Sequence, residues 1–181
     1  MSTVSLGTKL VQAVQKEAAM QRPLPLQATA EVSVSGSGRH ESLVTASVTL
    51  TDHDRFSHLV EGVQVEITPT KPATSRSGSK LDTQDKAQCF AQRATYLTEA
   101  LQFVEKDAGG SAILRSSPQT MRAPRAEYFE AQVSDTSIAL KRYQPRAAKP
   151  GRAPVTFCLT DEVLARLADD AAAALTPPAK K

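Results

Sequence analysis

The sequence predicts a single α+β domain in which an antiparallel sheet packs against helices. Strand candidates with alternating apolar and polar residues follow one another between residues 28 and 67. A long segment with apolar residues at intervals of three and four, typical of a helix, comes next. A second run of strand candidates and a final helix complete the chain. Strands in runs, rather than in strict alternation with helices, favour α+β over a parallel sheet.

Length and composition set the scale of the domain. The chain has 181 residues, and we expect residues 1–175 to form one domain and the tail 176–181 to be disordered. Apolar residues make up 40% and charged residues 23%, as in ordinary soluble proteins. Only 4% of the residues are aromatic and none is Trp, so the core must be built from aliphatic side chains.

The first part of the chain predicts a helix and a three-strand meander. Residues 5–20 carry apolar side chains on one side, and Pro23 and Pro25 end this amphipathic helix. Three strands follow, with the apolar sets Ala28, Ala30, Val32 and Val34; Val44, Ala46, Val48 and Leu50; and Val63, Val65 and Ile67. Short loops between them predict antiparallel pairing with one face in water.

One long central helix is predicted after the meander, from about Thr83 to Ala108. Its apolar face comprises Ala87, Phe90, Ala94, Leu97, Leu101, Val104 and Ala108. Asp82 or Thr83 can cap its start, and Gly109-Gly110 permits the left-handed turn that ends many helices. We expect this helix to lie across the sheet, with shorter terminal helices beside it.

Several short strands and a final helix are predicted after residue 110. The strand candidates are residues 112–114, 129–133, 138–140 and 155–159. The turn at residues 134–136 joins the second and third of these into a hairpin. Thr160 can cap the last helix, which has Asp161 and Glu162 in its favoured first turn.

The sequence carries no sign of export or of a membrane segment. It has no signal-peptide pattern at its start and no run of about 18 apolar residues. Cys89 and Cys158 match neither a metal nor a redox spacing, so we expect buried reduced thiols, with a disulfide between them as the alternative. We therefore expect a cytoplasmic protein without a membrane partner.

Motifs for catalysis, metal binding and nucleotide binding are incomplete. His53 and His58 lie in a segment with two aspartates, but their spacing matches no established ligand pattern, and we interpret the segment as a solvated turn. The loop 75–80 lacks the first Gly and the Gly-Lys-Ser/Thr end of a phosphate-binding loop. No nucleophile and base form a recognisable signature, so we expect no enzyme, no cofactor and no metal.

Arg93 falls within the apolar face of the predicted central helix. A buried guanidinium needs a counter-charge, so we expect it to reach the edge of the sheet or to pair with a carboxylate such as Glu130. The alternative is a pocket in which Arg93 binds an anionic group of a ligand or partner.

The region 111–159 is basic, with eight Lys or Arg side chains against three acidic ones, although the whole chain has a net charge of only +3. The candidate binding residues here are Arg115, Arg122, Arg125, Arg146, Lys149 and Arg152. If its two basic loops lie at the same end of the sheet, they form an electrostatic surface for nucleic acid or an acidic protein. Against nucleic acid, Tyr128 and Phe129 stand between Glu127 and Glu130 in the sequence.

These observations favour a non-enzymatic intracellular binding or adaptor protein, which holds a protein partner on its sheet surface and basic loops. The alternative is a weak, sequence-independent nucleic-acid-binding protein that acts through the basic 111–159 region. A strand left at the edge of the sheet also offers a route to a homo-oligomer or to capture of an extended peptide.

Overall fold

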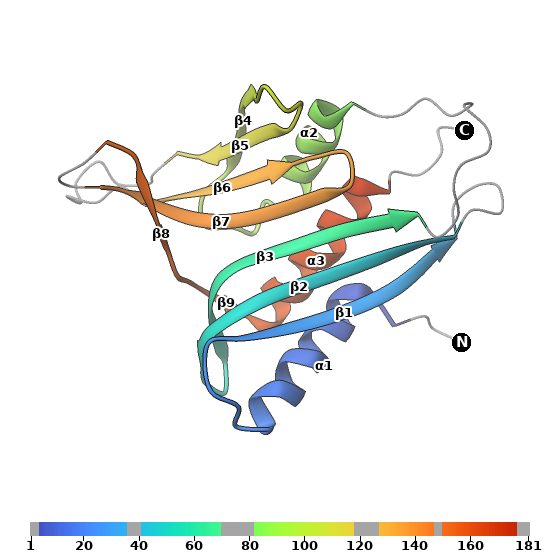
Figure 1. Ribbon diagram of the computed structural model, residues 1–181, viewed down its shortest axis with the longest axis vertical. Helices are drawn as coiled ribbons and strands as arrows, with labels where there is room; N and C mark the ends of the chain where they lie inside the picture. Colours follow the sequence, from blue (N-terminus) through green and yellow to red (C-terminus); the bar gives the residue numbers. More distant parts are fainter. Residues whose placement is uncertain (1–3, 36–40, 70–81, 118–126, 147–149, 177–181) are drawn as a thin grey trace.

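The computed structural model describes residues 4–35, 41–69, 82–117, 127–146 and 150–176. These residues form an open antiparallel sheet of nine strands with three helices on one face (Figure 1). The elements are α1 (Leu6–Ala19), β1 (Leu26–Ser35), β2 (Glu41–His53), β3 (Ser57–Pro69), α2 (Thr83–Arg93), β4 (Leu101–Lys106), β5 (Ala112–Ser116), β6 (Tyr128–Val133), β7 (Ser137–Pro145), β8 (Arg152–Val155), β9 (Phe157–Thr160) and α3 (Asp161–Leu175). The α+β class is confirmed.

The main path of the sheet runs β1-β2-β3-β7-β6-β5-β4, so β1 and β4 lie at its two ends. The predicted meander is confirmed, because β1 pairs with β2 and β2 with β3 in antiparallel register. The predicted hairpin is confirmed as β6 and β7. Alternate residues of β2, from Val44 to Leu50, are buried against the helices, as their apolar character requires.

The prediction of one long central helix is wrong. The helix α2 ends at Arg93, and the chain then turns through an irregular segment into strand β4. Ala94, Leu97 and Leu101 are still buried, so their spacing reflects burial but not a continuous helix. With 11 residues, α2 is also shorter than the terminal helices α1 and α3, which have 14 and 15.

The glycine pair after this segment belongs to a hairpin turn and not to a helix end. Asp107 N donates to Ser111 O at 2.8 Å, and Gly110 N donates to Asp107 O at 3.0 Å. Gly110 has φ +85°, a conformation that favours glycine. The turn therefore lets β4 fold back on β5 and extend the sheet.

The helices lie in a row on one face of the sheet, with α3 between α1 and α2 (Figure 1). Leu10, Phe90 and Leu164, one from each helix, are fully buried in the shared core. None of the helices formed by the described residues is long and apolar enough to cross a membrane. Cys89 and Cys158 are free thiols, but Cys89 is half-buried and Cys158 is exposed, so the expectation of two buried thiols is wrong.

The sheet forks between β3 and β7. These strands pair only where residues 62–66 meet residues 137–141. Beyond that point, the first residues of β3 pair with β9, and the last residues of β7 pair with β8. The predicted strand 155–159 is therefore divided at Thr156, because the chain crosses there from β7 to β3.

Candidate functional site

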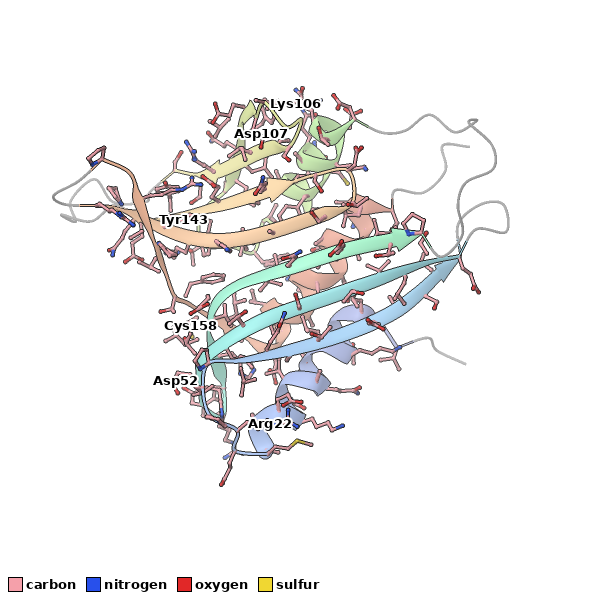
Figure 2. The ribbon with its side chains drawn as sticks, viewed as in Figure 1. Arg22, Asp52, Lys106, Asp107, Tyr143 and Cys158 are labelled. Atoms are coloured by element: carbon pink, nitrogen blue, oxygen red, sulfur yellow. The ribbon has the colours of Figure 1, made fainter. Side chains whose placement is uncertain are left out.

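The face of the sheet opposite the three helices is open, in that no described helix packs on it (Figure 1). We use the name "open face" for this side. Its side chains come from the polar positions of the alternating strands, such as Gln64 and Glu66 of β3. Figure 2 shows Tyr143 of β7 on the same sheet. A surface of this kind is accessible to a partner over most of the sheet.

A compact group of side chains lies on the open face over β5, β6, β7 and β8. We name it the arginine–tyrosine cluster; its members are Arg115, Tyr128, Glu130, Tyr143 and Arg152. Arg115 Nε donates to Glu130 Oε2 at 2.7 Å, and Arg152 Nη1 donates to the same oxygen. The Glu130 side chain is only 6% exposed, whereas each arginine side chain is 38% exposed. A nearly buried carboxylate thus holds two accessible guanidinium groups.

Each arginine of the cluster also lies over the ring of a tyrosine. The guanidinium carbon of Arg152 lies 4.2 Å from the ring centroid of Tyr143, and that of Arg115 lies 5.9 Å from the ring centroid of Tyr128. The two rings are neighbours, with centroids 6.2 Å apart. Burial acts to lower the pKa of Arg152, but its hydrogen bonds to Tyr128 and Glu130 outweigh this effect and raise that pKa.

The cluster brings together two of the basic residues singled out in the sequence. Arg115 and Arg152 are 37 positions apart by their residue numbers, yet they meet because β5 pairs with β6 and β8 pairs with β7. Arg146 is exposed just after the end of β7, opposite the start of β8. Arg122, Arg125 and Lys149 lie outside the described residues.

Charge is distributed unevenly over the open face. Lys141 is exposed on β7, and neither it nor Arg146 forms an ion pair within the described residues. The β5–β8 half, which has the cluster, therefore has an excess of positive charge. The β1–β3 half carries the exposed carboxylates Glu31, Glu61 and Glu66. This polarity favours the approach of an acidic group to the β5–β8 half.

A hollow of about 340 Å³ opens on this face beside the fork of the sheet. Its walls come from Gln27, Ser47, Thr49, Glu61, Gly62, Val63, Gln64, Ala139, Lys141, Pro154, Val155 and Thr156. Gly62 lies under the Lys141 side chain, because a Cβ there would stand 3.1 Å from Lys141 Cγ. The hollow therefore joins the basic half of the open face to the hydroxyl and amide groups of β1–β3.

Arg93 lies elsewhere, on the helical side of the molecule. Its Nη1 atom is 3.4 Å from Asp170 Oδ1 of α3, and its side chain is 43% exposed. Interaction with the Cys89 side chain, and then with Asp170, raises the pKa of Arg93. The suggested partner Glu130 is occupied by Arg115 and Arg152 instead. Arg93 does not line the hollow on the open face, and its ion pair links α2 to α3.

The histidine candidates are also separated from the open-face cluster. His58 is buried, and its Nε2 atom lies 2.6 Å from Asp161 Oδ1 at the start of α3. His53 pairs with His58 in the β2–β3 ladder. No three His, Cys, Asp or Glu side chains within the described ranges are grouped so that they could hold a metal ion.

A second polar network, which no sequence pattern predicted, lies on the helical side of the sheet. Buried Glu99 accepts from Ser116 Oγ at 2.5 Å and from Arg142 Nη2 at 3.2 Å. Arg142 Nε also donates to Glu127 Oε2 at 3.0 Å, and its guanidinium lies over the Phe129 ring. This network ties the segment before β4 to β5, β6 and β7, so its role is structural.

The contacts of Glu127 and Glu130 change the interpretation of the tyrosines. Glu127 turns to the helical side, where it binds Arg142, and Glu130 is covered by two arginines. The tyrosine pair on the open face is therefore surrounded by positive rather than negative groups.

No protein-family model, no curated protein and no solved structure matches this chain, and its function must be inferred from the geometry of this site.

Proposed function

We propose that this chain is a non-enzymatic intracellular binding protein that holds an acidic segment of a protein partner on its open face. The observation that carries the proposal is the convergence of Arg115 and Arg152 on the nearly buried Glu130. Glu130 fixes one side of each guanidinium, and the remaining N–H groups stay available to a carboxylate of the partner.

Preorganisation favours binding at this cluster. An arginine that is already held by a carboxylate and a tyrosine ring loses less side-chain freedom when it meets a partner. Arginine and tyrosine are also the residue types that contribute most to binding energy at protein interfaces. By contrast, guanidinium groups stay protonated at neutral pH and cannot act as bases, and the Glu130 carboxylate is occupied by two of them. The cluster therefore suits recognition better than acid–base catalysis.

The test is affinity capture from the host with matched variants. Tagged protein is purified at low salt, and captured proteins are identified by mass spectrometry. Lys141→Glu combined with Arg146→Glu reverses charge beside the cluster without removing an ion pair among the described residues. Lys16→Glu on the exposed side of α1 is the control. We expect the partner to be lost in the double variant and kept in the control; equal capture by both would contradict the proposal.

A second candidate function is binding of single-stranded nucleic acid. The observation that favours it is the Tyr128–Tyr143 pair on an open sheet face, flanked by Arg115 and Arg152. Aromatic rings that stack on bases, with cations beside them for the phosphates, are the common means of single-strand binding. The small net charge of +3 and the carboxylates over β1–β3 favour a protein partner over this candidate.

Nuclease treatment separates the two candidates. Half of each purified sample is treated with nuclease before the wash, and the absorbance at about 260 nm is recorded, where nucleobases absorb. Partners that remain in both halves support the protein-binding proposal. Nucleic acid in the untreated half alone, with an affinity that falls steeply as salt is added, supports the second candidate.

A further inference from the structure

The two ends of the sheet differ in how their edge strands are protected. At the β1 edge, Lys9 Nζ of α1 donates to Glu31 O at 3.1 Å, and a lysine at an edge is a common means of blocking strand pairing. At the other end, β4 pairs only with β5 among the described residues. Here Phe103 is 36% and Val104 45% exposed. The β4 edge thus combines free strand-pairing positions with exposed apolar side chains.

A β-bulge determines which way the side chains of β4 point. Gln102 pairs with Arg115 and Glu105 with Ile113, and both partners lie on the open-face side of β5. The register shifts between Phe103 and Glu105, so Gln102 and Glu105 share one face although three positions separate them. Leu101, Phe103 and Lys106 pair with residues of the helical side, namely Ser116, Leu114 and Ala112.

We propose that β4 pairs antiparallel with β4 of a second copy of this chain, across a two-fold axis between Phe103 and Val104. In this register Phe103 stands opposite Val104 of the second copy, and Gln102 stands opposite Glu105 of the second copy. Both members of the Gln102–Glu105 pair lie on the open face, as an antiparallel ladder requires. The two sheets then join into one continuous sheet through the dimer.

The chemistry of the edge favours a second copy over an unrelated strand. The apolar pair is self-complementary under two-fold symmetry, so each Phe103 covers a Val104 that is otherwise exposed. Gln102 can donate an amide N–H to the Glu105 carboxylate of the second copy, and the symmetry provides this pair twice.

Oligomeric state in solution is the first test. Sedimentation equilibrium of the purified full chain over a wide concentration range is expected to show a monomer–dimer equilibrium. Phe103→Asp and Val104→Asp are each expected to raise the dissociation constant about tenfold or more. Phe56→Asp is the matched control, because Phe56 is 76% exposed at the β2–β3 turn. Circular dichroism and unfolding midpoints verify that each variant is folded.

Cysteine cross-linking tests the register itself. In a Cys89→Ser, Cys158→Ser background, Gln102→Cys combined with Glu105→Cys is expected to give a disulfide-linked dimer on mild oxidation. The control is Gln27→Cys combined with Ser33→Cys on the exposed side of β1, which is expected to form no disulfide-linked dimer.

Three results would each overturn the proposal: a monomer at every concentration, a dimer that the two aspartate variants leave intact, or equal cross-linking of the two cysteine pairs. A dimer that survives the aspartate variants would place the contact on another surface. These tests use the chain without its partner and leave the arginine–tyrosine cluster unchanged. Their failure is therefore distinguishable from failure of the proposed function.

Discussion

Arg115 Nε of β5 lies 2.7 Å from Glu130 Oε2 of β6, on the face of the sheet that no described helix covers. Arg152 of β8 binds the same oxygen, so three strands meet at one carboxylate. The carboxylate is nearly buried while the guanidiniums stay accessible, so these ion pairs can stabilise the fold and, under the proposed function, also bind the partner.

Replacing Glu130 is expected to destabilise the fold. Glu130→Gln removes the counter-charge of two guanidiniums that are held together, and we expect a loss of about 1–3 kcal/mol in the free energy of unfolding. Urea denaturation measures this loss, and Glu66→Gln, at an exposed position of β3, is the control. A Glu130 variant as stable as the control would show that the cluster adds nothing to the fold.

Stability is expected to fall at high pH because of Tyr96. Burial, and then the nearby Asp170 carboxylate, raises the pKa of Tyr96 well above its ordinary value of 10.0. The unfolded chain therefore loses this proton first, and the stability contributed by the protonated phenol is fully present below pH 10 and declines as the pH rises further. Urea denaturation of the parent and of Tyr96→Phe is compared from neutral pH upward. The variant is expected to lose less stability above pH 10; parallel profiles would rule out this origin.

Close packing of α1 against α3 depends on Gly7. A Cβ at this position would lie 2.0 Å from the backbone oxygen of Ala165, which is far inside contact distance. Gly7 N also donates to Asp169 Oδ1 at 2.8 Å. Gly7→Ala must push the helices apart, and we expect a loss of about 1–3 kcal/mol in thermal or urea unfolding. Gly109→Ala in the β4–β5 turn, where the nearest atom is a side-chain oxygen, should cost less.

Phe90 is the largest fully buried side chain among the described residues, and α2 contributes it to the core. Phe90→Ala is expected to cost about 3–5 kcal/mol, because it leaves a cavity in the shared core. Phe56→Ala, at a position that is 76% exposed, is expected to change the free energy of unfolding by less than about 0.5 kcal/mol. Similar values for the two variants would contradict the position of α2 against the sheet.

The elements predicted well from the sequence are those whose hydrophobic period determines their structure. The alternation of Val44 to Leu50 matches the buried side of β2, and Thr160 caps α3 with its side chain on Val163 N. The register of the β6–β7 hairpin follows from its short turn. That register places Tyr128 opposite Tyr143, so the tyrosine pair could have been found from the sequence.

Other features depend on tertiary contacts that the sequence does not reveal. Ala94 and Leu97 have the spacing of a helix, but they are buried as part of an irregular segment. The helix does not continue through them, because Leu101 and the following residues pair with β5 as a strand. Arg93 is near the apolar side of α2, yet it reaches Asp170 on a helix far away in the sequence. The meeting of Arg115 and Arg152 depends on the fork in the sheet, which no local pattern predicts.

Lysine footprinting of the captured complex locates the partner on the surface of the chain. The free chain and the chain bound to its partner are treated with a lysine-acylating reagent, and modification is measured by mass spectrometry. We predict that Lys141 on the open face becomes protected in the complex, whereas Lys16 on the helical side is modified equally in both samples. Protection of Lys16 with Lys141 unchanged would place the partner on the helices and rule out binding to the open face.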